Sequence, residues 1–545
     1  MAFVFTSRVS RPSVHLRITR PLMFARLAYR AQSTLSCQPD HVAAQLDFRT
    51  FVNVLRADGD LAEINDQVDP HLEVGAIVRR VSEVNGKAPL FNNVKGAKNG
   101  LWRIFGNAAS LRSREEEKYG RIARSFGLPP DSSWKAILQR SQEAKRRPPI
   151  APRILSTGPC KQHKIFGDDI DLHKLPAPKL HQGDAGKYLQ TYGVHVLQSP
   201  DGKWTNWSIF RGMIHDSRRL VCLVGSGQHN SVIRDMWLKK GKTEVSWALA
   251  FGVPPAASVV AACPVPQGVS EAEYVGAMVG RPLDVVKCEL SDLLVPANSE
   301  IVMEGTFSFK DKAPEGPFED YLGLHFSDDQ HMQPLFTVNA ITYRDGAILP
   351  VSVPGKITDE SHVTASMASE ELLELLRQHG YPVIDAFAPL ETYATWCALK
   401  VDVKKLAEMR TTPEEFCNKI GNLAFNDKSS MLMNRIMLFG HDVDVGNFRD
   451  IMWALATRCR PGQDEYVFDD IPVLPLTPYM SHGRGNPTRG GKVVSDCLFP
   501  MEYEGKTSFR ACDFERSYPE EIKDRVRSNW TAMGFDVVES PSRST

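Results

Sequence analysis

Residues 188–215 read YLQTYGVHVLQSPDGKWTNWSIFRGMIH, and this stretch decides the fold class of the middle of the chain. Two runs rich in β-branched and aromatic residues flank Ser-Pro-Asp-Gly, a turn signal, so we expect a β-hairpin. Further runs with strand character follow at 219–225, 257–266, 300–309 and 335–344. The sequence therefore predicts a middle part built mainly of antiparallel sheet, with a barrel as the expected form.

Amphipathic helices are expected on both sides of this sheet-rich middle. Asp47 can cap a helix that ends near Gly59, because the apolar residues after it recur with helical spacing. The stretch ASEELLELLRQHGYP (368–382) predicts a second helix that stops at its glycine and proline, and residues 518–535 predict a third. KRRPPIAPRI (145–154) is charged and then Pro-rich, which is typical of a linker.

The composition excludes some classes of function. The 545 residues hold 65 Lys and Arg and 65 Asp and Glu, so no global field recruits nucleic acid or an anionic membrane. No apolar run approaches the ~18 residues that span a bilayer, which predicts a soluble protein. Ten scattered cysteines form no CxxC pair, which indicates reduced, mostly buried thiols rather than disulfides or a zinc site.

The first 38 residues differ from the rest of the chain. They carry six arginines and several hydroxyl side chains, and no acidic residue occurs before Asp40. This composition is typical of a mitochondrial transit peptide, with a disordered basic tail as the alternative. We therefore expect residues 1–38 to be a targeting segment and the protein to be mitochondrial, or otherwise cytoplasmic.

The stretch PEGPFEDYLG (314–323) crowds three carboxylates onto a stiff turn. Two prolines restrict the backbone on either side of Glu315, and Glu319 and Asp320 follow closely. Crowded carboxylates raise one another's proton affinity, which makes a proton donor near neutral pH. From this segment alone, a solvated acidic turn remains the favoured interpretation.

Asn206 and Arg211 lie five residues apart in the second strand of the hairpin. That spacing corresponds to roughly 17 Å of extended chain, which suits opposite ends of a flavin nucleotide. An odd spacing on a regular pleat points two side chains to opposite faces, so we expect a bulge or a strand end between them. Arg211 could pair with the acidic turn or bind a substrate carboxylate, and a surface cross-strand arginine is the alternative.

Other polar residues are candidates for binding a metal or a phosphate. Gln228 and His229 follow an apolar strand, and Glu271 stands at an expected helix start. Asn, His and Glu ligands suit Mn²⁺ or Mg²⁺ on a phosphate better than zinc, although a lone histidine more often has a structural role. The Gly-rich, basic stretch SHGRGNPTRGGKVVSD (481–496) lacks the order of a P-loop, so we expect an ordered structural loop.

Together these motifs resemble the UbiD family of decarboxylases, most of all the fungal ferulic (cinnamic) acid decarboxylases. The motifs are TNWSI-x-R from 205, QH at 228, GVSEAEYVGAM from 268, VPANSEIVMEG from 295, PEGPF from 314, RCRPG from 458 and GGKVVSD from 490. They follow the family's order between about residues 46 and 535. The resemblance implies prenylated FMN as cofactor, supplied by a separate flavin prenyltransferase.

The resemblance also implies a mixed α+β and α/β fold in three parts. An N-terminal α/β portion is expected at 39–145 and a split β-barrel that binds the cofactor at 146–350. A C-terminal α/β domain at 351–545 is expected to form a homodimer.

Carried over residue by residue, the family's catalytic triad is an arginine between two acids, here Arg211, Glu315 and Asp320. Arg211 would hold the substrate carboxylate and keep Glu315 ionised. Asp320 would donate a proton to the carbon that CO₂ leaves. Because Glu319 adds another acid next to it, a donor role for Glu319 stays open.

The resemblance assigns the cofactor and two metal ions to neighbouring residues. The residues implied to line prenylated FMN are Asn206, Trp207, Ser208, Ile209, Phe210, Arg211, Gln228, His229, Glu271 and Lys428. Those implied to hold Mn²⁺ are Asn206, His229 and Glu271. Those implied to hold K⁺ are Glu271 and the backbone near Trp207, Ala261 and Cys263.

The chain departs from the ferulate enzymes in the expected substrate pocket. Tyr321 stands where they carry methionine, and Ala365, Leu432 and Leu474 replace isoleucine, threonine and phenylalanine. One methylene in an apolar pocket changes discrimination by ~1–3 kcal/mol, so four changes can redirect the choice of substrate. LVGSGQH also replaces a Pro-Pro-Gln-His approach to His229, which would loosen that loop.

The expected function is therefore reversible, non-oxidative decarboxylation of phenylacrylic acids such as ferulic, cinnamic and p-coumaric acid. One alternative keeps the cofactor and acts on another unsaturated, aromatic or heteroaromatic acid. A second alternative is a non-catalytic flavin-binding or assembly protein, which the intact triad disfavours. A metal hydrolase that uses Glu315 as base lacks a compact ligand set.

Overall fold

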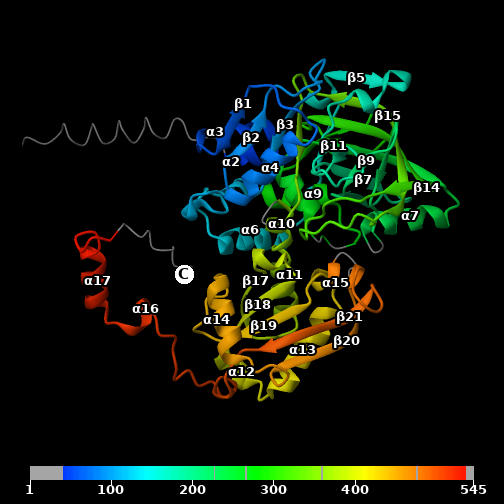
Figure 1. Ribbon diagram of the computed structural model, residues 1–545. Coiled ribbons are helices and arrows are strands. Elements are labelled where there is room, and N and C mark those ends of the chain that lie inside the picture. The colour runs from blue at the N-terminus through cyan, green and yellow to red at the C-terminus, as the bar shows by residue number, and fades with distance from the viewer. Residues whose placement is uncertain are drawn as a thin grey trace, which may run out of the picture. The chain divides into compact units, whose positions relative to one another are not determined.

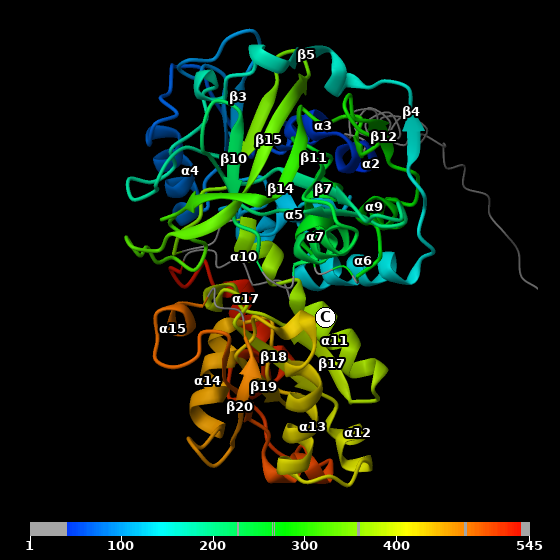
Figure 2. The ribbon, with the colours of Figure 1, turned by 90° about the vertical axis from the view of Figure 1, so that its right-hand side faces the viewer.

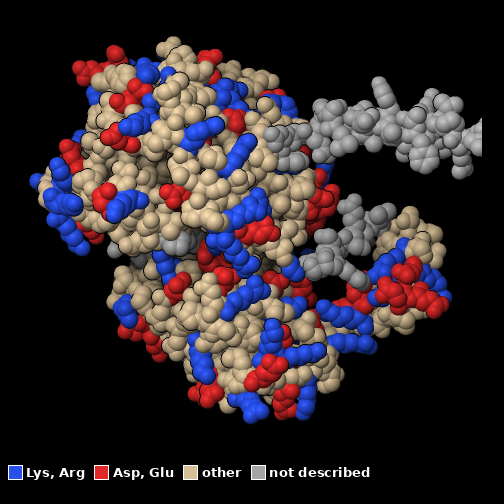
Figure 3. Space-filling view, turned by 180° about the vertical axis from the view of Figure 1, so that it is seen from behind, with Lys and Arg blue, Asp and Glu red and all other residues tan. Residues whose placement is uncertain are grey.

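The computed structural model describes residues 41–225, 228–263, 265, 267–356, 360–473 and 477–535. The expected transit peptide at 1–38 and the expected pocket residue Leu474 lie outside these residues. Within them, no helix is both long and apolar enough to cross a lipid bilayer. Figure 3 shows basic and acidic side chains interspersed over one face, in line with the balanced charge of the chain.

The N-terminal part is a small sheet with helices packed against it (Figure 1). Its strands lie in the order β1 (Leu61–Ile64), β2 (Ala88–Phe91), β3 (Arg103–Gly106) and β16 (Ile348–Val351). Its helices are α2 (His41–Leu46), α3 (Phe48–Ala57), α4 (Glu73–Val84), α5 (Gly120–Ser125) and α6 (Trp134–Arg146). Helix α3 begins as predicted, because the Asp47 side chain accepts a hydrogen bond from the Thr50 N–H.

The middle of the chain forms the predicted antiparallel sheet. Its strands are β5 (His163–Phe166), β6 (Tyr188–Gln190), β7 (Val194–Gln198), β8 (Thr205–Ser208), β9 (Gly212–Ile214), β10 (Arg219–Cys222), β11 (Glu244–Phe251), β14 (Ile301–Glu315) and β15 (His331–Tyr343). They pair in the order β6-β9-β10-β15-β14-β11-β7-β8, and β5 joins β15. Strands β7 and β8 form the predicted hairpin.

Strand β8 ends at Ser208 and β9 begins at Gly212. The expected strand end between Asn206 and Arg211 is therefore confirmed. Arg211 lies in the gap between two strands rather than on a regular pleat, which frees its side chain from the alternation of the sheet.

Both faces of the sheet are buried. Along β11, Trp247 and Leu249 join one hydrophobic cluster with Phe336, whereas Ala248 and Ala250 join another with helix α8 (Pro255–Ala262). The strand predicted at 257–266 was wrong, because most of these residues form α8. Residues 255–261 are all buried, so the apolar run shows no helical period, and Pro255 suits the first turn of a helix.

Three more strands and two helices complete the middle part. A separate sheet has the order β13 (Leu294–Pro296), β12 (Asp284–Lys287) and β4 (Arg153–Leu155). Helix α7 (His229–Lys239) begins at His229, and α9 (Glu271–Val279) begins at Glu271, where the sequence predicted a helix start.

The C-terminal domain is a sheet with helices on both faces (Figure 2). Its strands lie in the order β17 (Val383–Phe387), β18 (Trp396–Val401), β19 (Arg435–Phe439), β21 (Arg489–Asp496) and β20 (Glu465–Pro472). Its helices are α10 (Glu360–Ala365), α11 (Ala368–Gln378), α12 (Val403–Glu408), α13 (Pro413–Phe425), α14 (Phe448–Arg458), α15 (Pro478–Ser481), α16 (Phe514–Ser517) and α17 (Glu520–Asn529). Helices α11 and α17 confirm the two helices predicted in this part.

Strand β19 shows why both faces of that sheet carry helices. Ile436 and Leu438 pack with Phe416 of α13, whereas Met437 and Phe439 pack with Ile451 of α14. Apolar side chains therefore alternate between two cores rather than between core and solvent.

The loop expected at 481–496 is only partly a loop, since its second half is β21. Lys492 of this strand is buried, and its Nζ donates to the carbonyl oxygens of Ser430 and Met431 at 3.0 and 3.1 Å. Burial lowers the pKa of Lys492 to about 8. The strand thus fixes the end of the short 3₁₀ helix η6 (Lys428–Ser430).

The described cysteines are free, and most of them are buried, as the composition predicted. This agrees with the scattered cysteine spacing, which offered no disulfide framework.

A buried ion cluster holds α5 against the start of β1. Arg121 is fully buried and donates to both carboxylate oxygens of Asp60 at 2.8 Å, and to Ser110 Oγ at 2.9 Å. Arg112 Nε also lies 2.8 Å from Asp60. Breaking a buried pair leaves a charge without its partner, which costs about 3–5 kcal/mol.

We expect Arg121→Met to lower the melting temperature by about 6 °C or more, because roughly 1 kcal/mol corresponds to 2–4 °C in a domain of this size. Arg153→Met is the matched control, since Arg153 pairs with Asp284 on the surface with its side chain 66% exposed. Thermal unfolding followed by circular dichroism measures both. Equal shifts for the two variants would contradict a structural role for the buried cluster.

Candidate active site

Arg211 joins two acids of the 314–323 turn. Its Nε and one terminal nitrogen lie 2.9 and 3.0 Å from the two carboxylate oxygens of Glu315, and its other terminal nitrogen lies 2.6 Å from Asp320 Oδ2. Burial lowers the pKa of Arg211, but Glu315 and then Asp320 raise it above its ordinary value. The structure therefore brings together the three residues that the resemblance implied as a triad.

The turn that carries the acids is held tightly. Glu315 ends β14 and is fully buried, and Gly316 follows with a φ of 90°. A Cβ at Gly316 would approach the Asp329 carbonyl oxygen to 2.4 Å, so only glycine fits here. The chain can thus turn sharply after Glu315 and bring Asp320 back to the same guanidinium.

Two aromatic side chains surround the triad, and neither was predicted as a site residue. The Tyr188 hydroxyl donates to Glu315 Oε1 at 2.7 Å. The Phe318 ring lies 4.9 Å from the Arg211 guanidinium and 4.2 Å from the Tyr188 ring. Residues 188 and 315 are 127 positions apart, so no local pattern could pair them.

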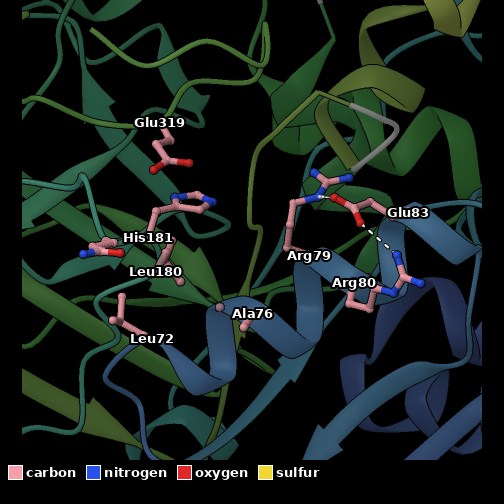
Figure 4. A pocket seen from close by; sticks show the side chains of 10 residues that line it. Leu72, Ala76, Arg79, Arg80, Glu83, Leu180, His181 and Glu319 are labelled. Carbon is pink, nitrogen blue, oxygen red and sulfur yellow. Dashed lines mark hydrogen bonds and ion pairs between the residues drawn. The ribbon is translucent and has the colours of Figure 1, made fainter. Parts of the chain in front are cut away.

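Glu319 and Asp320 occupy different surroundings. Asp320 contacts Arg211, whereas Glu319 lines a cavity together with His181 and Arg79 (Figure 4). The Glu319 backbone N–H donates to the buried Asp184 carboxylate at 3.1 Å. The geometry therefore favours Asp320 over Glu319 as the acid that acts beside Arg211.

A second cluster gathers residues expected to bind the cofactor phosphate and a metal ion. His229 Nδ1 lies 3.0 Å from Asn206 Oδ1, and its Nε2 lies 2.7 Å from the Lys428 Nζ. Glu271 Oε2 accepts the Trp207 backbone N–H at 2.8 Å. Since Lys428 can only donate, the neutral imidazole carries its proton on Nδ1.

Burial dominates the electrostatics of this second cluster. It raises the pKa of Glu271 to about 8, although the Trp207 N–H opposes the shift. Burial, followed by Lys428, lowers the pKa of His229 to about 4. Burial also lowers the pKa of Lys428, which Glu271 opposes. A neutral imidazole next to a carboxylate and an amide is a donor set suited to a hard divalent cation.

The other residues expected to contact the cofactor are sequence neighbours of Arg211 and His229. Ser208 Oγ accepts from Asn230 at 2.7 Å, and Gln228 precedes the first turn of α7. Ile209 packs on the core, and the Phe210 ring stacks on buried His195 at 3.5 Å. His195 Nε2 also lies 3.1 Å from the Phe210 carbonyl oxygen, which fixes the backbone next to Arg211.

The residues expected at the K⁺ site and the substrate pocket are less closely grouped. Trp207, Ala261 and Cys263 pack in one hydrophobic cluster next to Glu271. The backbone N–H of Tyr321 donates to Asp320 Oδ1 at 2.6 Å. Ala365 ends α10, and Leu432 lies between η6 and β19.

Three family models match the chain in order. The matched domains are the N-terminal, Rift-related and C-terminal domains of 3-octaprenyl-4-hydroxybenzoate carboxy-lyase, UbiD, at residues 52–141, 153–357 and 361–497. Together they cover most of the chain.

Curated relatives match over nearly their whole length. The chain is 46% identical to ferulic acid decarboxylase 1 of Saccharomyces cerevisiae, over 90% of this chain and 98% of the yeast protein. It is 39% identical to pyrrole-2-carboxylic acid decarboxylase of Pseudomonas aeruginosa, over 90% of this chain and 98% of that protein.

Solved structures match the fold. The closed form of vanillic acid decarboxylase from Sedimentibacter hydroxybenzoicus superposes with a TM-score of 0.74 at 23% identity, over 89% of this chain and 98% of that one. An evolved dimeric form of the UbiD-class enzyme HmfF from Pelotomaculum thermopropionicum, in complex with prFMN, gives 0.70 at 24% identity, over 86% and 96%. With three matched domains and full-length relatives, the chain belongs to the UbiD family of carboxy-lyases.

Proposed function

We propose that the protein is a prenylated-FMN-dependent, reversible decarboxylase that converts phenylacrylic acids into the vinyl product and CO₂. Ferulic, cinnamic and p-coumaric acid are the expected substrates. The high identity to a ferulic acid decarboxylase over almost the full chain supports this choice. The observation that carries the proposal is the buried Arg211 held between Glu315 and Asp320.

Each member of the triad has a distinct task. Arg211 offers a fixed, charged fork that can bind a substrate carboxylate in two-point fashion. Glu315 is fully buried and holds two of its nitrogens, so it keeps the guanidinium oriented. Asp320 has a side chain 32% exposed, so it can exchange protons with solvent between turnovers.

The proton balance of the reaction assigns Asp320 its step. Loss of CO₂ leaves an electron pair on the carbon that carried the carboxylate. Asp320, in its protonated form, donates a proton to that carbon and becomes a carboxylate beside Arg211. A proton from solvent then restores the acid, so one proton is consumed for each CO₂ released.

The residues present fit the cofactor and its ions. Asn206, His229 and Glu271 provide the donor set for Mn²⁺, and Lys428 adds a cation for the phosphate. Prenylated FMN, when bound, supplies the electron sink that decarboxylation of an unsaturated acid requires. We assign K⁺ to Glu271 and the backbone near Trp207, Ala261 and Cys263. A separate flavin prenyltransferase would supply the cofactor.

A second candidate keeps this chemistry and changes the substrate. The relative from Pseudomonas aeruginosa is a pyrrole-2-carboxylic acid decarboxylase, so a heteroaromatic acid is the alternative. Tyr321, Ala365 and Leu432 are the described residues expected to decide between the two. A binding protein without activity is disfavoured, because it would not need a buried arginine between two acids.

We also propose a homodimer formed through the C-terminal domain. This domain exposes large apolar side chains, including Val467 at 64%. In the segment that carries α16 and α17, Arg527 forms ion pairs with Glu515 and Glu520 of the same segment. Tyr518 and Phe535 of this segment are exposed. Exposed apolar side chains of this kind are typical of surfaces that bind a partner.

Substitution of the two acids tests their roles. With protein co-expressed with a flavin prenyltransferase, we expect cinnamate and ferulate to release CO₂, and Asp320→Asn to lower kcat by about 10²–10⁴-fold because the proton donor is lost. Glu315→Gln should lower activity by a similar factor, since Arg211 loses its charged partner. Headspace analysis and HPLC of the vinyl products measure both.

Glu319→Gln is the matched control, because it removes a neighbouring carboxylate that does not contact Arg211. We expect it to keep kcat within about threefold of the parent. A loss as large as that of Asp320→Asn would instead make Glu319 the donor. Turnover of pyrrole-2-carboxylate and other aromatic acids alone would keep the mechanism and change the substrate.

Substitution of the expected metal ligands tests the metal site. His229→Asn and Glu271→Gln should each reduce bound manganese and flavin about tenfold or more, because one ligand is lost or weakened. Metal analysis and flavin absorbance of the purified proteins give both quantities without an activity assay. Full manganese content in both variants would place the ion elsewhere.

The mass of the protein in solution tests the proposed assembly. We expect light scattering coupled to gel filtration to give twice the mass of one chain, and Val467→Lys to shift the protein toward the monomer because a charge enters an apolar contact. Ile154→Lys, at an exposed apolar position of the middle part, is the control. A monomeric parent protein would refute the proposal.

A further inference from the structure

Tyr188 is a buried tyrosine whose hydroxyl contacts the triad at Glu315. Its hydroxyl oxygen lies 2.7 Å from Glu315 Oε1, the same oxygen that Arg211 Nε reaches at 2.9 Å. Because a carboxylate only accepts, the hydroxyl donates. Glu315 therefore receives three hydrogen bonds, two from a cation and one from a neutral group.

Several contacts hold Tyr188 and the acidic turn together as one unit. The Tyr188 backbone N–H donates to the Pro178 carbonyl oxygen at 2.9 Å, and its ring packs on Phe318 at 4.2 Å. Three residues earlier, the Ala185 N–H donates to the Pro317 carbonyl oxygen at 2.9 Å. Asp184 accepts the N–H of Glu319. These contacts, between the segment that carries Tyr188 and the 314–323 turn, therefore hold the hydroxyl against Glu315.

Two other ionisable groups near Glu315, Arg211 and Cys222, must be considered together with Tyr188. Arg211 is shared between Glu315 and Asp320, and in turnover it must also face the substrate carboxylate. The Cys222 thiol is nearby, but burial and then Glu315 raise its pKa well above the ordinary value, so it adds no charge. Burial, and then Glu315, likewise raise the pKa of Tyr188, so the hydroxyl keeps its proton.

We infer that Tyr188 is a positioning residue that keeps the Glu315 carboxylate aligned when Arg211 turns part of its charge toward the substrate. This inference rests on the proposed function. The hydroxyl contacts Glu315 directly. Its contribution is therefore to the orientation of Glu315, and through Glu315 to that of Arg211.

The test compares kcat and KM of Tyr188→Phe with those of the parent, with cinnamate and co-expressed prenyltransferase. Losing a hydrogen bond to a charged group should lower kcat by about tenfold, because Glu315 then holds Arg211 less well in the transition state. KM should change by less than kcat, since Arg211 keeps its charge for the substrate carboxylate.

Tyr343→Phe is the matched control, since it removes a hydroxyl from another buried tyrosine of the same sheet whose ring stacks on His163. We expect its kcat and KM to match those of the parent. An unchanged kcat in Tyr188→Phe, or a loss of kcat accompanied by an equal or larger rise in KM, would overturn the inference and leave a packing role. If the parent itself releases no CO₂ from any acid, the proposed function fails instead.

Discussion

The guanidinium of Arg211 is the constraint on which the site depends. A buried cation is stable only where anions and hydrogen-bond acceptors surround it, and here Glu315 and Asp320 provide them. The gap between β8 and β9 releases Arg211 from the pleat, and the sharp turn after β14 returns a second carboxylate to it. The gap between β8 and β9 and the turn after β14 therefore both position groups of the same ion-paired cluster around Arg211.

The two large domains share the second cluster. Lys428 comes from the C-terminal domain, whereas His229, Asn206 and Glu271 come from the sheet-rich middle. Buried Lys492 holds the carbonyl end of the short helix that begins with Lys428. The Gly-rich stretch at 481–496 thus supports this cluster indirectly, through the segment that Lys492 holds in place.

How far the sequence predicts this protein depends on the range of each interaction. The cap at Asp47, the hairpin and the strand end before Arg211 follow from local patterns, and all three occur. Helix α8 was predicted as a strand because burial on every side removes its period. Tyr188 was missed because its partner is far away in the chain. The triad joins segments that are distant in the sequence, so no local pattern predicts it. Its prediction came from the family resemblance.

Strand β16 pairs in parallel with β3, yet the entire middle part of the chain lies between them. The N-terminal sheet therefore gains its last strand only after the sheet-rich part has been made. During synthesis on a ribosome, one edge of β3 therefore lacks its partner strand until β16 emerges. The order of translation and the order of folding thus differ for this sheet, because its first strands reach their final packing only after the sheet-rich middle part has been made.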